Sequence, residues 1–441
     1  MSETDSRYWE ATDDPRFDSA KRRIKYNKDI RRTDTSIMPP SVATVSNGVY
    51  NFKDNNRVTF NMGRGANSQT YLKNRVLSIR VRGYDLDVAT GLVETTLDQY
   101  SGITWDVAGA FFTGILIKLN NKKVVEEYKS TDDYSTSHMW RMLHKYGSDG
   151  LERNGMGFLP PCMDTVDTTT ALSTNTQLRI TNSFTRVTKD GFIQFDFTFG
   201  DLLACCDADK FYNNIDDVEL TLTLRKNTLV GVHATASEAT RYPVFDIMDM
   251  WVTMCEEEMK GTQGDVSSAE QKAGVDENME FIQTVVDSQE LNSNKIYMGR
   301  HKNTQFVTTC FRADDVATTN VRRDQFLLNG TTKYQAQYGS DFMPTSEIDS
   351  QYSHTSLHRE YVRSTKRMGN PVIAPAISNY DFLTYALMTT ALNDSNLPIL
   401  TSTDRDVRAF ITATTGKNYT IMAHNLVTAT ISVDKNVALN N

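Results

Sequence analysis

The stretch Ile193–Asn227, IQFDFTFGDLLACCDADKFYNNIDDVELTLTLRKN, changes its hydrophobic period twice. Residues Phe195–Phe199 alternate apolar and polar side chains, as in a half-buried strand. Residues Asp201–Cys206 then have the spacing of a short helix, with Asp201 as its N-cap. A second alternating run follows at Val218–Leu224. The stretch therefore predicts a strand, a short helix and a second strand.

A second passage, Asn379–Asn418, repeats this order of elements. Its residues Phe382–Leu392 have helical spacing, and Val407–Ala413 alternate as Val218–Leu224 do. The two passages are separated by the length of a large β domain, whereas solenoid repeats recur at about 20–50 residues. We therefore expect two related domains in tandem, with two unrelated helix-then-strand passages as the alternative.

Length and composition are those of a folded chain with more than one domain. The 441 residues allow two or three domains, each large enough to bury its own core. A content of 10% aromatic and 39% hydrophobic residues excludes a disordered protein. The net charge of −8 means that the surface as a whole does not attract nucleic acid or anionic lipid, so any such contact must be local.

The cysteines and the N-terminal sequence indicate the compartment. Five cysteines form an odd set without a CxxC pair, which predicts reduced, mostly buried thiols rather than disulfides, zinc or a redox site. The N-terminus MSETDSRYWEATDDP has no apolar signal core, and no spanning helix is visible. We therefore expect a protein that is made in the cytosol and is not secreted.

Residues 1–40 are predicted to form an N-terminal arm. An acidic beginning is followed by a basic segment that ends before Met38-Pro39-Pro40. The candidate contact residues in this segment are Lys21, Arg22, Arg23, Lys25, Lys28, Arg31 and Arg32. Charge pattern alone leaves two interpretations open: an arm that contacts nucleic acid, an inner membrane leaflet or a neighbouring subunit, and a solvated tail.

Strand signals dominate the rest of the chain and predict two β domains, at 41–235 and 236–441. The first begins with a hairpin turn at Asn47-Gly48, and Ser135–Tyr146 is its second helix candidate. Pro243–Glu256 has a pattern that fits a strand buried on both sides or a helix; we choose the strand, because a new β domain should begin there. The polar region from 329 to 370 is expected to be an external loop.

Catalytic and metal-binding motifs are missing at the expected spacings. His354 and His358 are four residues apart, but Thr355 stands where a metalloprotease helix needs glutamate. Adjacent acids such as Asp216-Asp217 point to opposite faces of a strand and do not form a catalytic pair by themselves. We therefore expect no enzyme activity and no cofactor.

Four segments resemble one protein family. FDFTFGDLLACCDADKFYNNIDDVELTLTLRKNT, at Phe195–Thr228, resembles the end of the first barrel of double jelly-roll major capsid proteins, above all those of Polinton-like and adintovirus-like elements. VFDIMDMWVTM, at Val244–Met254, looks like the opening strand of the second barrel. FLLNGTTKY, at Phe326–Tyr334, looks like part of the long second-barrel loop, and Tyr419–Val433 like the final strand.

This resemblance implies an all-β fold with a few short helices, built from two tandem eight-stranded jelly-roll β-barrels. It implies a structural protein of the virion capsid, in homotrimeric, pseudo-hexagonal capsomers of an icosahedral DNA-virus shell. The implied partners are neighbouring capsomers, vertex (penton) and minor capsid proteins, and genome or inner membrane at the basic arm.

Two other functions remain possible from the residues. A receptor- or carbohydrate-binding attachment protein would use the exposed polar loops expected at 87–108 and 312–370. A β-sandwich hydrolase would use carboxylates that meet only in the fold.

Overall fold

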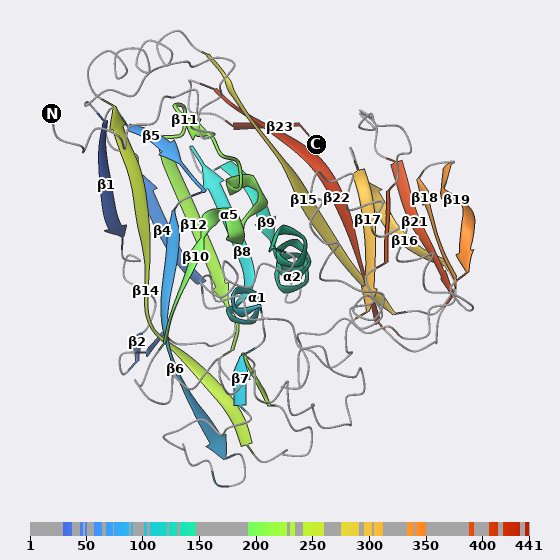
Figure 1. Ribbon diagram of the computed structural model, residues 1–441, viewed down its shortest axis with the longest axis horizontal. Coiled ribbons are helices and arrows are strands. Elements are labelled where there is room, and N and C mark those ends of the chain that lie inside the picture. The colour runs from blue at the N-terminus through green and yellow to red at the C-terminus, as the bar shows by residue number, and fades with distance from the viewer. Residues whose placement is uncertain are drawn as a thin grey trace, which may run out of the picture.

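In the computed structural model, strands make up most of the described residues and form two halves that lie side by side (Figure 1). The structure describes residues 30–37, 45–46, 49–50, 57–63, 68–73, 75–87, 90, 101–103, 106–120, 123–129, 133–146, 193–226, 230–233, 241–259, 275–290, 295–301, 304–311, 333–338, 341–349, 388–391, 405–412, 418–432 and 437–440.

The first half has two antiparallel sheets. The larger sheet consists, in order, of β10 (Ile193–Thr198), β6 (Val76–Asp87), β14 (Arg241–Met259), β5 (Ser68–Tyr71) and β11 (Phe211–Tyr212), with β1 (Ile30–Ile37) also paired to β14. The smaller sheet consists of β4 (Arg57–Gly63), β12 (Asp217–Leu224), β8 (Phe112–Leu119) and β9 (Lys123–Tyr128). Two separate two-stranded sheets complete the first half: β13 (Gly231–His233) with β7 (Ser101–Ile103), and β2 (Val45–Ser46) with β3 (Val49–Tyr50).

The second half repeats this two-sheet plan. One sheet consists of β15 (Glu277–Glu290), β22 (Asn418–Ile431), β17 (Thr304–Phe311) and β20 (Met388–Ala391), with β23 (Val437–Asn440) paired to β22. The other consists of β16 (Lys295–His301), β21 (Arg405–Thr412), β18 (Lys333–Tyr338) and β19 (Asp341–Asp349).

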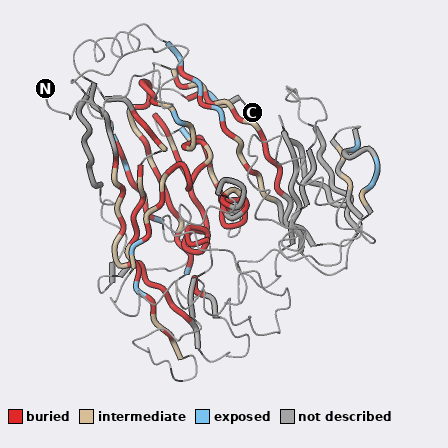
Figure 2. The backbone as a smooth tube through the Cα atoms, in the orientation of Figure 1, coloured by how far each residue is buried: buried red, intermediate tan, exposed pale blue. Residues whose placement is uncertain are grey.

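Alternation along each strand places the core between the sheets. On β12, for example, Val218, Leu220 and Leu222 are buried, while Glu219 and Thr223 are partly exposed. The buried cluster does not stop at the first half: Phe281 of β15 and Val437 of β23 belong to the same cluster. Figure 2 shows the buried residues continuing from the first half onto β15 and β22. The described core of the first half therefore extends onto β15, β22 and β23 of the second half.

The helices are short and lie mainly between the halves: α1 (Val107–Phe111), α2 (Asp133–Tyr146), α5 (Phe199–Leu202) and the 3-10 turn η2 (Ala204–Cys206). The helix predicted at Ser135–Tyr146 is confirmed as α2. No helix within these described segments is long and apolar enough to cross a membrane.

The helix predicted to start at Asp201 starts earlier. Thr198 is the N-cap of α5, and its hydroxyl accepts a hydrogen bond from the Asp201 N–H at 3.2 Å. The same hydroxyl donates to Asp201 Oδ2 at 2.6 Å. Thr198 and Asp201 thus have the relative positions of a capping box, in which the acid stands three residues after the cap. The sequence pattern predicted Asp201 as the N-cap because this residue directly precedes the two leucines, but the Thr198 hydroxyl caps the helix.

Strand pairing bears on three further expectations. The segment Val244–Met254 is a strand, as predicted, but β14 pairs with β6 and β1 in the first half, so the expected boundary at 235/236 precedes a strand of the first large sheet. Met388–Ala391, in the segment predicted as helix, is strand β20 paired with β17. The polar region expected to be a loop contains β18 and β19. β14 and β20 each pair with a strand distant in sequence, and this pairing decides their place in the fold.

Other expectations have mixed outcomes. The strands that flank Asn47-Gly48 pair as a hairpin, and the strand predicted at Val407–Ala413 is β21. His354, His358 and the basic residues Lys21, Arg22, Arg23, Lys25 and Lys28 lie outside the described residues.

Candidate functional site

The segment from Phe199 to Asp216, which connects β10 to β12, is the candidate site because both halves hold it. It contains α5, η2 and β11. Two buried glutamates from different halves bind its backbone N–H groups, and one buried asparagine binds its far end. We call this segment the connector.

Glu126 of β9 holds the connector from the first half. Its Oε2 accepts a hydrogen bond from the Cys205 N–H at 2.8 Å, and its Oε1 accepts one from the Ala204 N–H at 3.3 Å. The Tyr128 hydroxyl also donates to Glu126 Oε1, at 2.9 Å. The first N–H groups of a helical turn have no partner inside that turn, so this fully buried carboxylate caps η2 from a neighbouring strand.

Glu277 of β15 holds the connector from the second half. Its Oε2 accepts hydrogen bonds from the N–H groups of Asn213 and Asn214, at 2.8 and 2.9 Å. The contact is reciprocal, because Asn214 Nδ2 donates to the carbonyl oxygens of Val275, at 2.7 Å, and Ile431, at 3.3 Å. The two consecutive N–H groups compensate the cost of burying a carboxylate.

Asn120 fixes the end of the connector. It follows β8 with a φ of 33°, in the left-handed region that asparagine tolerates better than most residues. Its side chain is fully buried; Nδ2 donates to the Asn214 carbonyl at 2.5 Å, and Oδ1 accepts from the Asp216 N–H at 2.8 Å. This strained turn therefore orients the backbone that Glu277 binds.

A ring stack between α2 and β22 also joins the halves. Trp140 of α2 stacks on His424 of β22, with ring centroids 4.0 Å apart and an interplanar angle of 27°. His424 is fully buried, and its Nδ1 lies 3.1 Å from the Thr284 hydroxyl of β15. The helix predicted from sequence thus supplies an aromatic contact between the halves.

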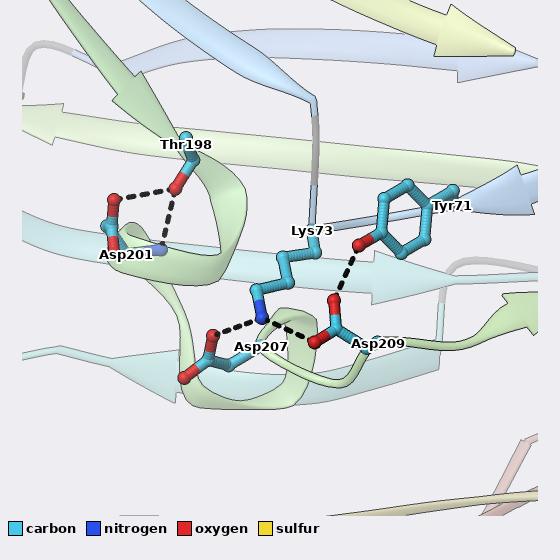
Figure 3. A network of polar contacts seen from close by, with 6 residues as sticks. All are labelled: Tyr71, Lys73, Thr198, Asp201, Asp207 and Asp209. Atoms are coloured by element: carbon cyan, nitrogen blue, oxygen red, sulfur yellow. Dashed lines mark hydrogen bonds and ion pairs between the residues drawn. The ribbon is translucent and has the colours of Figure 1, made fainter. Parts of the chain in front are cut away.

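The outer side of the connector carries a partly exposed polar network (Figure 3). Lys73 Nζ lies 3.0 Å from Asp209 Oδ2 and 3.7 Å from Asp207 Oδ1. The Tyr71 hydroxyl donates to Asp209 Oδ1 at 2.7 Å. Figure 3 shows Lys73 reaching between the two acids that follow η2. Exposed pairs of this kind stabilise by about 1 kcal/mol or less, so the buried glutamates dominate the joint.

A second buried polar pair ties two helices of the first half. His138 Nδ1 of α2 lies 2.8 Å from Asp106 Oδ1, and Asp106 caps α1 by accepting from the Gly109 N–H at 3.0 Å. An acid beside an imidazole is a possible general-base pair, but both side chains are at most 4% exposed. The pair therefore fastens α1 to α2 and has no access to a substrate.

Burial disfavours the ionised forms of two phenols and one thiol, those of Tyr128, Tyr134 and Cys205. The pKa of Tyr128 and that of Tyr134 are raised well above the ordinary value, mainly by burial. Burial, reinforced by the adjacent Cys206, also raises the pKa of Cys205 well above its usual value. Both cysteines are free and buried, as predicted, and a neutral thiol is a poor nucleophile and metal ligand. Among the side chains that the structure describes, no group of three His, Cys, Asp or Glu residues could hold a metal ion.

The structure separates the residues predicted for the basic arm. Arg31 and Arg32 lie in β1, where the register places them opposite Glu258 and Glu257 of β14. The other five fall outside the described segments. The sequence did not indicate the roles of Glu126, Glu277 and Asn120, because each lies in a segment whose pattern is typical of a solvated strand end or turn. Only their tertiary partners distinguish them from surface residues.

No protein-family profile matches the sequence, and neither does any curated protein. Solved structures do match. A chain of the Sputnik virophage, from a cryo-EM structure, superposes with a TM-score of 0.61 at 10% identity, covering 95% of this chain and 90% of that one. The major capsid protein of mavirus superposes with a TM-score of 0.52 at 12% identity, covering 92% of this chain and 90% of its own. At such identities the likeness concerns the fold. The expected all-β fold of two tandem jelly rolls is confirmed, while a particular closeness to Polinton-like elements stays a prediction.

Proposed function

We propose that this chain is the major capsid protein of an icosahedral DNA virus and forms homotrimeric, pseudo-hexagonal capsomers. The observation that carries the proposal is the fusion of two jelly rolls into one block. One buried cluster extends across both halves, Glu277 and Asn214 join them at the connector, and the Trp140–His424 stack joins α2 to β22. The likeness to the mavirus major capsid protein in fold supports the same role.

The geometry of this block suits a shell. Three chains of two joined barrels place six similar barrels in a ring, so a three-fold assembly can occupy a six-fold position in a lattice. Such a building block needs a fixed angle between its halves, because a variable angle would prevent the ring from closing. The buried joint at the connector supplies that fixed angle.

The role is structural rather than enzymatic. The acid–imidazole pair Asp106–His138 is buried and used between helices. The proposed partners are neighbouring capsomers and the vertex (penton) and minor capsid proteins. The chain would be made in the host cytoplasm or nucleus and would then become part of the virion capsid.

For the N-terminal arm we retain the proposed contact with genome or inner membrane. The residues are Lys21, Arg22, Arg23, Lys25, Lys28, Arg31 and Arg32. Arg31 and Arg32 stand opposite two glutamates in β14, so the first five are the better candidates for an external anionic partner.

Native mass spectrometry and negative-stain microscopy of the purified full-length protein test the capsomer. We expect a mass three times the 49.8 kDa of one chain and a six-sided outline in projection. A protein that remains monomeric at high concentration would overturn the proposal.

A further inference from the structure

One face of the large sheet in the first half carries an unusual group of side chains. On β6, Ile79 and Val81 point into the core, so Arg80 and Arg82 lie on the opposite face. On β14, Trp251 stands between buried Met250 and Val252 and therefore shares that outer face. We call this surface the outer β6–β14 face. Its members are Arg80, Arg82, Tyr84, Asp246, Asp249 and Trp251.

These side chains hold one another in place. The Arg80 guanidinium lies over the Trp251 ring, 5.5 Å from its centroid, with its NH1 3.9 Å from Asp249 Oδ2. The Arg82 guanidinium lies 5.9 Å from the centroid of Tyr84, with its NH2 3.5 Å from Asp246 Oδ2. The face is thus ordered before any partner arrives, which lowers the entropic cost of binding.

The face is partly open to solvent: Arg82 is exposed, Arg80, Tyr84 and Trp251 are partly exposed, and Asp246 is buried. The side chain of Arg80 is 38% exposed and that of Arg82 is 48% exposed. Trp, Tyr and Arg are the residues that dominate the energetics of protein–protein interfaces. The two arginines stand beside Asp246 and Asp249, so there is no local excess of positive charge that would fit a nucleic acid. The chemistry of this face is that of a protein-binding surface.

Its position selects the partner. In Figure 1, β6 and β14 lie on the side of the first half away from the second half, and β18 and β19 lie on the opposite side of the molecule. In a closed ring of identical two-barrel chains, the outer side of one first half must meet the outer end of the next second half. Such a contact is heterologous: each chain uses two different surfaces.

The far end of the second half carries side chains that complement this face. β19 pairs only with β18 among the described strands, which makes it an edge of its sheet. It bears Phe342, 41% exposed, and exposed Glu347. An exposed aromatic ring and a carboxylate are suitable contacts for the Trp251 and Arg82 side chains.

We propose that the outer β6–β14 face binds the β18–β19 end of a neighbouring copy of this chain. This contact rests on the proposed capsomer and names the surfaces that close it. Trp251 and Arg82 are its central residues on one side, and Phe342 and Glu347 on the other.

Native mass spectrometry of full-length variants over a dilution series tests the contact. The first variant is R82A/W251A, which removes one surface, and the second is F342A/E347R, which removes the other. Each is expected to raise the concentration at which trimers dissociate by about tenfold or more. R57E, an exposed arginine on β4 in the other sheet, is the matched control and should leave the trimer unchanged.

Mixing the two variants gives the sharper result. Each retains the surface that the other lacks, so an equimolar mixture should form dimers through the one intact pair of surfaces but no trimers. If R82A/W251A does not fold by circular dichroism, R80A/R82A, which keeps the tryptophan, replaces it in the same mixture.

The outcomes separate this contact from the capsomer itself. A monomeric wild type would overturn the proposed function and the contact with it. A trimeric wild type whose trimers survive either double substitution would overturn the contact alone. A wild type that binds a glycan array, with binding lost in W251A and trimers intact, would assign the face to sugar recognition and also overturn the contact.

Discussion

Glu126 and Glu277 bind the backbone of one connector at two places, the first holding the Cys205 N–H at 2.8 Å and the second the Asn214 N–H at 2.9 Å. Glu126 belongs to the first half and Glu277 to the second. Both carboxylates are buried, and each accepts hydrogen bonds from two consecutive backbone N–H groups. The connector is therefore the place where the fold of one half depends on the other.

Replacing Glu277 with alanine should destabilise the whole chain. The N–H groups of Asn213 and Asn214 would lose this buried acceptor, which costs about 2–4 kcal/mol of unfolding free energy. Glu277→Gln keeps one acceptor oxygen and should lose only about half of that. Urea unfolding followed by circular dichroism measures both. Glu280→Ala, on the same strand but exposed, should have little effect; equal losses from Glu277→Ala and Glu280→Ala would contradict the joint.

At position 120, replacement of asparagine by glycine should destabilise the protein less than replacement by alanine. Both substitutions remove the hydrogen bonds to Asn214 and Asp216, but only glycine is relaxed at a φ of 33°. Alanine should therefore be less stable than glycine by about 1 kcal/mol. Thermal and chemical unfolding of the two variants gives the difference. An Ala variant as stable as the Gly variant would show that the turn relaxes when its side chain is lost.

Cys205 and Cys206 should resist thiol reagents in the folded protein. Burial raises the pKa of Cys205 far above pH 8, and both thiols are about 1% exposed. Brief iodoacetamide treatment at pH 8, followed by peptide mass mapping, should leave this peptide unmodified in buffer and modify it in denaturant. The same treatment of E277A tests whether the joint shields the thiols, with faster labelling as the expected result.

Tyr84 should make stability sensitive to alkaline pH. Burial, and then the charge of Asp246, raise the pKa of Tyr84 to about 12. An unfolded tyrosine has a pKa of about 10. The stabilisation is therefore complete below pH 10 and is lost as the pH rises from 10 through the folded-state pKa, because the unfolded chain loses its proton first. Unfolding free energies of Tyr84→Phe should fall less steeply than those of wild type between pH 10 and 11.5; parallel curves would contradict the assignment.

Two N-terminal truncations should behave differently. Deletion of residues 1–29 keeps β1 and should leave the thermal midpoint unchanged while impairing shell assembly or content. Deletion of residues 1–37 also removes the strand paired with Val252–Met259, and it should lower the midpoint and favour aggregation through the newly open edge. Differential scanning fluorimetry and light scattering compare them. Normal particles from the shorter deletion would exclude the proposed role of Lys21–Lys28.

The sequence by itself determined the local elements and much of the fold class. Alternation at Phe195–Phe199 and Val218–Leu224 predicted β10 and β12, and helical spacing predicted α2, because side-chain periodicity follows directly from backbone geometry. The resemblance at Phe195–Thr228 correctly indicated two tandem jelly rolls. Burial of Cys205 and Cys206 followed from the same pattern.

Only the tertiary structure decided which strands pair and which polar residues are buried. The hydrophobic pattern of Val244–Met254 would be the same in a sheet of either half. Its place beside β6 and β1 therefore depends on partners more than 150 residues away in the sequence. Met388–Ala391 has helical spacing but becomes strand β20, because pairing with β17 satisfies its backbone. The stretch at Ile193–Asn227 predicted its own strands and helix; that Glu126 and Glu277 bind it, and so join two barrels into one block, depends on residues that meet only after folding.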